Sequence, residues 1–292
     1  MNKHIKWFRY TMWLGILADW VFGLPAIFVP QKVLSLLGFR LTQDPVWTAF
    51  AALLVVLLSL FYIPGASNPS RYHFSTWLAV FARPLEVIFF SLLTLGYYPT
   101  FALFNGFLFL IQFPLLLIIK HQPSEEYELP QALQARAEDR SAVWLKQTLW
   151  LGILANWILG VPAIFAPERL LNLVGARPTQ DPVWTAFAAL ILVLLGLFYI
   201  PGANQPYRYR ANVWMAVFAR LPSVIFFFLL WPRVYPTFGL LDGLLFLLQF
   251  PFLVTTSELI PERRLKDTEI FEYKGTTFRP TENALRSSVG DA

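Results

Sequence analysis

The chain has no cysteine and few charged residues, and both absences narrow what it can be. Without cysteine it can form no disulfide, no thiolate nucleophile and no cysteine-ligated iron–sulfur cluster. Only 14% of the 292 residues are charged and 57% are hydrophobic, whereas a typical soluble domain has about 25% charged residues. The composition therefore excludes an ordinary soluble globular protein and favours an integral membrane protein.

Histidine is almost as scarce. His4, His73 and His121 each lie in a polar segment beside an apolar stretch, and none lies within one. This placement excludes a bis-histidine haem in a bundle core and a histidine-rich metal site. The sequence also lacks a phosphate-binding glycine loop, a G-x-S-x-G turn and an H-E-x-x-H motif. We therefore predict no catalytic residue, no metal and no required cofactor.

The sequence contains two similar copies of one unit, offset by 137 residues. Trp13–Ala18 recurs as Trp150–Ala155, and Thr42–Phe50 recurs as Thr179–Phe187. From Thr11 to Ile119 the two copies align without a gap, and about six positions in ten are identical. This pattern indicates a tandem duplication.

Each copy contains four apolar stretches of roughly 20 residues, the length that a helix needs to cross the hydrocarbon core. They run near 11–29, 46–63, 74–95, 99–119, 148–166, 183–200, 211–231 and 236–256. We predict an all-α polytopic membrane protein with eight transmembrane helices, arranged as two tandem parallel four-helix repeats. The predicted segments are repeat 1–120, linker 121–147, repeat 148–256 and polar tail 257–292.

The basic residues predict the orientation. Sixteen of the 23 lysines and arginines lie on the predicted side of the membrane that carries both termini, the linker and the tail, and five lie on the opposite side. Positive charge favours the cytoplasm, so we expect both termini there, in a bacterial inner (cytoplasmic) membrane. The net charge of +5 is then a sign of topology and not of nucleic-acid binding. Because four spans are an even number, the copies should share one orientation and be related by a pseudo-twofold along the membrane normal.

Polar side chains near the middle of the predicted spans are the candidate ligand-binding residues. They are Asp19, Arg83, Glu86, Asn105 and Gln112 in the first copy, and Asn156, Arg220, Asp242 and Gln249 in the second. An unpaired charge at the bilayer centre costs roughly 2.5–3.5 kcal/mol. We therefore predict that Asp19 pairs with Arg83, with Glu86 as a further candidate, and that Asp242 pairs with Arg220.

Three interpretations of these residues stay open. They can be a polar staple that fixes the register of the helices, or an arginine-centred site for an anionic or quinone-like molecule. They can also form a proton or ion path through Asp19, Glu86 and Asp242. By contrast, Asp44 and Asp181 precede prolines at predicted helix starts and are expected to be helix caps. Trp20 and Trp157 are expected to pack in the core.

One stretch resembles a known family. Gly23-Leu24-Pro25 through Pro30–Gly38, its counterpart Gly160–Gly175 and the arginine-bearing third span are similar to the DoxX-like group of four-helix membrane proteins. The resemblance implies a four-helix bundle per repeat and an accessory subunit, often beside oxidoreductases or quinone-linked systems. This chain departs from the group by joining two units, and no catalytic residue carries over.

Together these features predict a non-catalytic integral membrane subunit of an inner-membrane complex. It would contact membrane lipids, hold a lipid or quinone between its helices, and anchor or organise other subunits through the linker and the tail. The alternative is a small-solute or ion transporter that uses Arg83, Glu86, Arg220 and Asp242.

Overall fold

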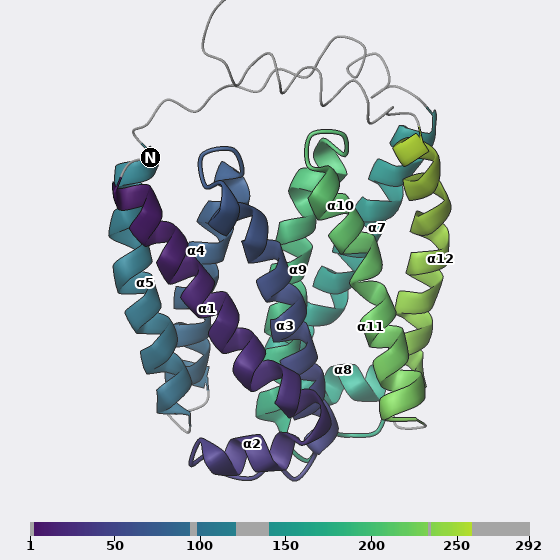
Figure 1. The fold of residues 1–292 in the computed structure, drawn as a ribbon. Helices are drawn as coiled ribbons and strands as arrows, with labels where there is room; N and C mark the ends of the chain where they lie inside the picture. The colour runs from purple at the N-terminus through teal and green to yellow at the C-terminus, as the bar shows by residue number, and fades with distance from the viewer. Residues whose placement is uncertain (1–2, 94–97, 121–139, 233–234, 259–292) are drawn as a thin grey trace, which may run out of the picture. The chain divides into compact units, whose positions relative to one another are not determined.

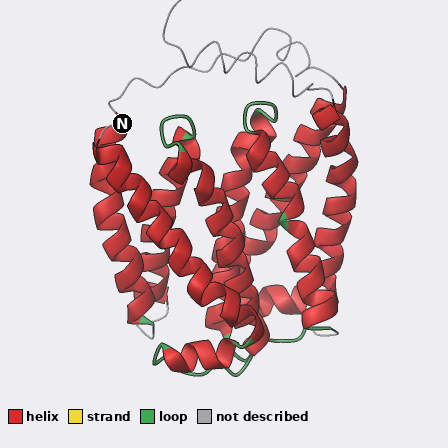
Figure 2. Cartoon of the chain, viewed as in Figure 1, coloured by secondary structure: helices red, strands yellow, loops and turns green. Residues whose placement is uncertain are grey.

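The computed structural model describes residues 3–93, 98–120, 140–232 and 235–258. These residues form helices and contain no strand (Figure 2). Met1–Val254 form one compact unit, to which the contacts below belong, and Thr255–Ala292 form a second. The helices are α1 Lys3–Phe28, α2 Pro30–Leu36, α3 Pro45–Ser67, α4 His73–Ile88, η1 Phe89–Leu93, α5 Pro99–Lys120, α7 Arg140–Phe165, α8 Pro167–Leu173, α9 Pro182–Asn204, α10 Arg210–Phe218, α11 Arg220–Ile225, η2 Phe226–Leu230 and α12 Pro236–Glu258.

Eight of the described helical stretches are long and apolar enough to cross a membrane. They are α1, α3, α4 with η1, α5, α7, α9, α10 to η2, and α12. The all-α, eight-span prediction is confirmed, and the chain is a multi-pass membrane-helix bundle. Leu103 and Leu110 on α5 are more than 70% exposed, as residues that face lipid tails should be.

Two details differ from the sequence-based expectation. The connections expected at 30–45 and 167–182 each contain a seven-residue helix, α2 and α8. Each begins at a proline and is followed by a glycine of positive φ, Gly38 at 70° and Gly175 at 67°, which ends the helix in the left-handed region. Helix α7 also begins at Arg140, so the last eight residues of the predicted linker 121–147 are helical.

Helices α3 and α9 form the centre of the bundle (Figure 1). Their most apolar windows are 78% and 67% buried, against at most 50% for the other six spans. Equivalent aromatic contacts join the two halves in both directions. The ring centroids of Phe50 and Phe227 are 4.7 Å apart, and those of Phe187 and Phe90, the equivalent pair, are 4.6 Å apart. Each half therefore buries its central helix against the other half.

Candidate functional site

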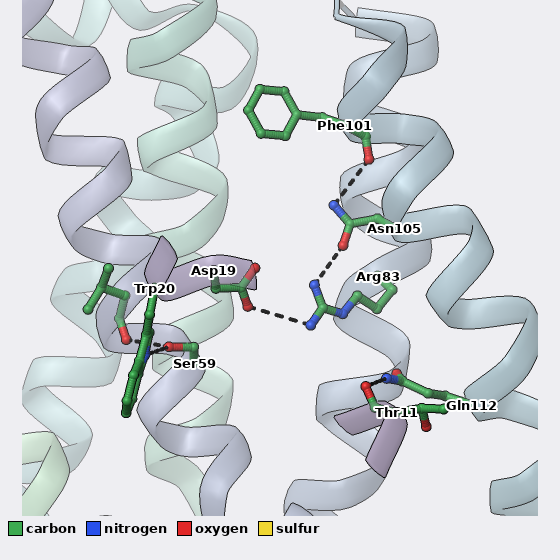
Figure 3. Close-up of polar contacts among 9 residues, drawn as sticks. Thr11, Asp19, Trp20, Ser59, Arg83, Phe101, Asn105 and Gln112 are labelled. Carbon is green, nitrogen blue, oxygen red and sulfur yellow. Dashed lines mark hydrogen bonds and ion pairs between the residues drawn. The ribbon is translucent and has the colours of Figure 1, made fainter. Parts of the chain in front are cut away.

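The polar cluster of the first half is centred on Arg83 of α4 (Figure 3). The side chain is only 2% exposed, and its Nη2 lies 3.5 Å from Oδ2 of Asp19 on α1. Its Nη1 donates a 2.7 Å hydrogen bond to Oδ1 of Asn105 on α5, whose Nδ2 donates to the Phe101 carbonyl. The guanidinium carbon lies 5.3 Å from the ring centroid of Tyr62. Arg83 thus links three spans to the central helix.

The second half builds a related cluster around Arg220, which is 3% exposed. Its Nη1 lies 2.7 Å from Oδ1 of Asp242 on α12, and its Nε donates to Oε1 of Gln249 at 3.2 Å. Gln249 in turn donates to the Thr148 carbonyl at 2.8 Å. Both predicted arginine–acid pairs are therefore confirmed, Asp19 with Arg83 and Asp242 with Arg220.

The first cluster is less completely hydrogen-bonded than the second. Gln112 donates to the Thr11 carbonyl at 3.1 Å, as Gln249 does to Thr148. However, Nε of Arg83 and Oε1 of Gln112 are buried without a hydrogen-bond partner among the described residues, whereas the corresponding atoms of Arg220 and Gln249 bond to each other. Buried polar atoms without partners are rare, so this difference requires an explanation.

Glu86, the further candidate partner of Arg83, is buried near the arginine without forming an ion pair with it. It is 6% exposed, and the ion pairs of the described residues join Arg83 to Asp19 and do not include Glu86. In the second half, Ser223 occupies the equivalent position and is also buried. The first half therefore holds one carboxyl group more than the second.

Glu86 and Asp19 line a cavity of about 100 Å³ between α1, α2, α3, α4, η1, α5 and α9. The lining residues also include Asn105 and Thr48. Thr48 is 3% exposed, and its hydroxyl has no hydrogen-bond partner among the described residues. The rest of the wall is apolar, with the aromatic residues Phe22, Phe90, Phe101, Phe104, Trp184 and Phe187. The cavity has room for several waters or for a small headgroup, but not for a whole lipid.

Two glycines that the sequence analysis did not single out leave the space that the two arginine side chains occupy. A Cβ atom added to Gly15 on α1 would lie 2.5 Å from Nη2 of Arg83. A Cβ atom added to Gly152 on α7 would collide with Nη2 of Arg220. Both glycines lie in the repeated Trp-Leu-Gly segment, but this repetition alone does not indicate which side chain needs the space.

The candidate caps Asp44 and Asp181 instead connect the two halves. Each is the N-cap residue, as predicted, but neither makes a side-chain capping hydrogen bond. The Asp44 carboxylate accepts hydrogen bonds from Oγ1 of Thr179 at 3.4 Å and from the Tyr235 hydroxyl at 3.5 Å. Burial raises the pKa of Asp44 above 3.8, and the Thr179 hydrogen bond opposes this shift.

Asp181 has the mirrored environment. Burial raises its pKa above 3.8, while a hydrogen bond from Thr42 and the charge of Arg40 oppose this rise. The pKa of Tyr98 rises as well, first because of burial and then because of the charge of Asp181. The two aspartates thus take reciprocal positions between the halves.

The two deep tryptophans have structural contacts. Nε1 of Trp20 donates to Oγ of Ser59 at 2.6 Å, and Nε1 of Trp157 donates to the Val193 carbonyl at 3.2 Å. Gly196 replaces Ser59 in the second half, and a Cβ atom there would lie 2.6 Å from Nε1 of Trp157. Both tryptophans therefore join the first span of their half to its central helix.

The remaining candidate, Asn156, is 9% exposed at the position equivalent to Asp19. Among the residues that the structure describes, no group of three or more histidine, cysteine or acidic side chains could hold a metal ion. The linker and tail residues expected to dock partners are 121–147 and 257–292, and most of them lie outside the described residues.

No model of a known protein family, no curated protein and no solved structure matches this chain. The resemblance to the DoxX-like group therefore stays a prediction that rests on the residues quoted for it.

Proposed function

We propose that the protein is a non-catalytic integral membrane subunit whose first half holds the polar end of an amphipathic molecule, a lipid or a quinone. The observation that carries the proposal is the difference between the halves. The second half completes its arginine cluster with its own side chains. The first leaves Arg83 Nε and Gln112 Oε1 without partners among the described residues, and it places an additional carboxyl group, that of Glu86, in the wall of a cavity. A polar headgroup in this cavity would lie against the carboxyl group of Glu86 and beside Thr48, whose hydroxyl has no partner among the described residues.

The apolar wall supports an amphiphile over a freely soluble ligand. Most residues around the cavity are aliphatic or aromatic, and many neighbouring side chains on α1 and α5 are exposed and apolar. An alkyl or isoprenoid tail would extend from the cavity between these helices into lipid. The protein would then bind this ligand without converting it chemically.

A substitution that fills the cavity tests the proposal. Ala18 of α1 lines the cavity, and Ala155 of α7 is its counterpart in the second half. We expect native mass spectrometry of the protein in mild detergent to show a bound amphiphile in the wild type and in Ala155→Phe. The amphiphile should be absent from Ala18→Phe. Absence from the wild type, or equal retention in both variants, would contradict the proposal.

We further propose that the subunit belongs to an inner-membrane complex, with both termini in the cytoplasm. The distribution of basic residues supports this orientation. Mild-detergent purification followed by identification of co-purifying chains tests the assignment to a complex. A monodisperse single chain that carries its amphiphile would overturn the subunit assignment but leave the binding assignment in place.

Transport is the second candidate, because Asp19 and Glu86 place two carboxyl groups in a cavity within the spans. It predicts proton or solute flux in proteoliposomes that is lost when Arg83 and Arg220 are both replaced by Gln. Under the subunit proposal, the same pair of substitutions lowers stability or assembly, and the wild type shows no flux above that of empty liposomes.

A further inference from the structure

We infer that the cavity selects an amphiphile whose polar end is a protonated amine, and that Glu86 is the group that receives it. This inference rests on the proposed function, because it requires the cavity to bind an amphiphile. It adds the chemical class of the headgroup, which is opposite in charge to the anionic ligand that buried arginines suggest at first sight.

The first argument is the charge of the wall. Two carboxyl groups, Asp19 and Glu86, line the cavity, and no basic side chain is among its lining residues. Arg83 lies behind the wall, where its two terminal nitrogens are engaged by Asp19 and Asn105. Arg83 is the one positive charge for both carboxyl groups: it forms an ion pair with Asp19 and acts on Glu86 only at longer range. The two acids therefore share one counter-charge among the described residues. A buried carboxylate is costly unless a counter-charge or a proton accompanies it.

The second argument is the comparison with the other half, which serves as an internal reference. There one arginine, Arg220, is paired with one acid, Asp242, and the Glu86 position is Ser223. That cluster is balanced by its own side chains. The same arginine in the first half is accompanied by two acids, so the additional acid is Glu86. A cationic headgroup would restore the balance that Ser223 maintains in the second half.

The third argument is the remaining chemistry of the wall. Thr48 is a lining residue whose buried hydroxyl has no partner among the described residues, so its oxygen has the lone pairs to accept a second N–H bond from an ammonium group. Aromatic rings such as Phe90 and Phe104 surround the space, and the faces of such rings attract cations. A carboxylate or phosphate headgroup would instead face two carboxyl groups and be repelled.

The experiment compares three probes with the same twelve-carbon tail, which differ only in the headgroup. Dodecylammonium, dodecanol and dodecanoate are titrated at pH 7 into the wild-type protein in a neutral maltoside detergent, and binding is measured by native mass spectrometry. A charge-assisted hydrogen bond predicts that dodecylammonium binds roughly ten- to hundredfold more tightly than dodecanol. Dodecanoate should bind most weakly.

The variants assign that preference to Glu86. Glu86→Gln should reduce the ammonium-to-alcohol ratio to near one, while Glu86→Asp should retain most of it. Ser223→Ala, at the equivalent position of the second half, should keep the full ratio. If Glu86→Gln fails to fold, the wild-type comparison of the three probes still decides the inference.

The outcomes separate this inference from the proposed function. Equal binding of dodecylammonium and dodecanol, with both lost in Ala18→Phe, would overturn charge selection while leaving the amphiphile site in place. Preference for dodecanoate would overturn the inference in the same way. Binding of none of the three probes, together with no native amphiphile, would overturn the proposed function itself.

Discussion

Replacing the two paired aspartates by asparagine should have unequal effects, although both contact a buried arginine. Among the residues that the structure describes, Asp242 is the one acid paired with Arg220, at 2.7 Å, and Arg220 is 3% exposed. Asp242→Asn leaves that guanidinium without a counter-charge. Breaking a buried pair in this way costs about 3–5 kcal/mol of unfolding free energy.

Asp19→Asn should cost less. The Asp19–Arg83 distance is longer, at 3.5 Å, and Glu86 lies one helical turn from Arg83 as a second buried acid. The substitution removes one charged hydrogen bond, worth about 1.5–3 kcal/mol, but leaves one acid for one arginine. The expected cost is therefore at the lower end of that range.

Equilibrium unfolding in mixed micelles with increasing sodium dodecyl sulfate measures both costs, with tryptophan fluorescence as the signal. The double variant Arg220→Gln/Asp242→Asn is the control, because it removes both charges and should recover part of the stability lost in Asp242→Asn. An Asp19→Asn variant that is as unstable as Asp242→Asn, or less stable, would refute the charge count on which the binding site depends.

Three further predictions follow from other contacts. Gly152→Ala should lower the unfolding free energy by about 1–3 kcal/mol, because the added methyl group collides with Arg220. The control Gly106→Ala should leave it nearly unchanged, because its methyl group would meet only Val87, at 3.7 Å. Equal losses of unfolding free energy in a denaturant titration would contradict the role of Gly152. The pKa values of Asp44 and Asp181 are raised above 3.8 in the folded state, so the folded protein binds these protons more tightly than the unfolded chain does. The contribution of these two groups to the unfolding free energy should therefore fall as pH rises from about 3.8 through their raised pKa values. The unfolding free energy, measured at a series of pH values, should depend less steeply on pH in the double variant Asp44→Asn/Asp181→Asn. An unchanged pH dependence would contradict this assignment to the two aspartates. Finally, Ser59→Ala should destabilise the first half by about 1 kcal/mol because Trp20 loses its acceptor, whereas Thr11→Ala, which removes a hydroxyl that bonds only within its own helix, should cost less in the same unfolding titration.

The sequence predicted the features that the bilayer itself enforces. Eight spans follow from apolar length, because each must cover the hydrocarbon core. The pairs Asp19–Arg83 and Asp242–Arg220 follow from the cost of isolated charges in that core. These predictions needed no knowledge of which helices are neighbours, only the condition that buried charges have partners.

The features that depend on packing were not predictable in the same way. Gly15 and Gly152 look like ordinary small residues until the path of an arginine side chain across α1 or α7 is known. Asp44 occupies the cap position that the Asp-Pro pattern predicts, but its carboxylate reaches Thr179, which is 135 positions away in the sequence. The cavity arises from the way seven helical elements meet, and no local sequence pattern encodes it.

Photolabelling with an amphiphile tests the central claim most directly, since the claim is that the first half holds a ligand where the second half does not. A twelve-carbon amine with a photoreactive diazirine next to its headgroup would be activated in the detergent-purified protein, and the labelled peptides mapped by mass spectrometry. We predict labelling at the cavity residues of α1, α3 and α5, such as Ala18, Ala52 and Phe104, and its loss in Ala18→Phe. Equal labelling of the equivalent positions Ala155, Ala189 and Leu241 in the second half would contradict the account.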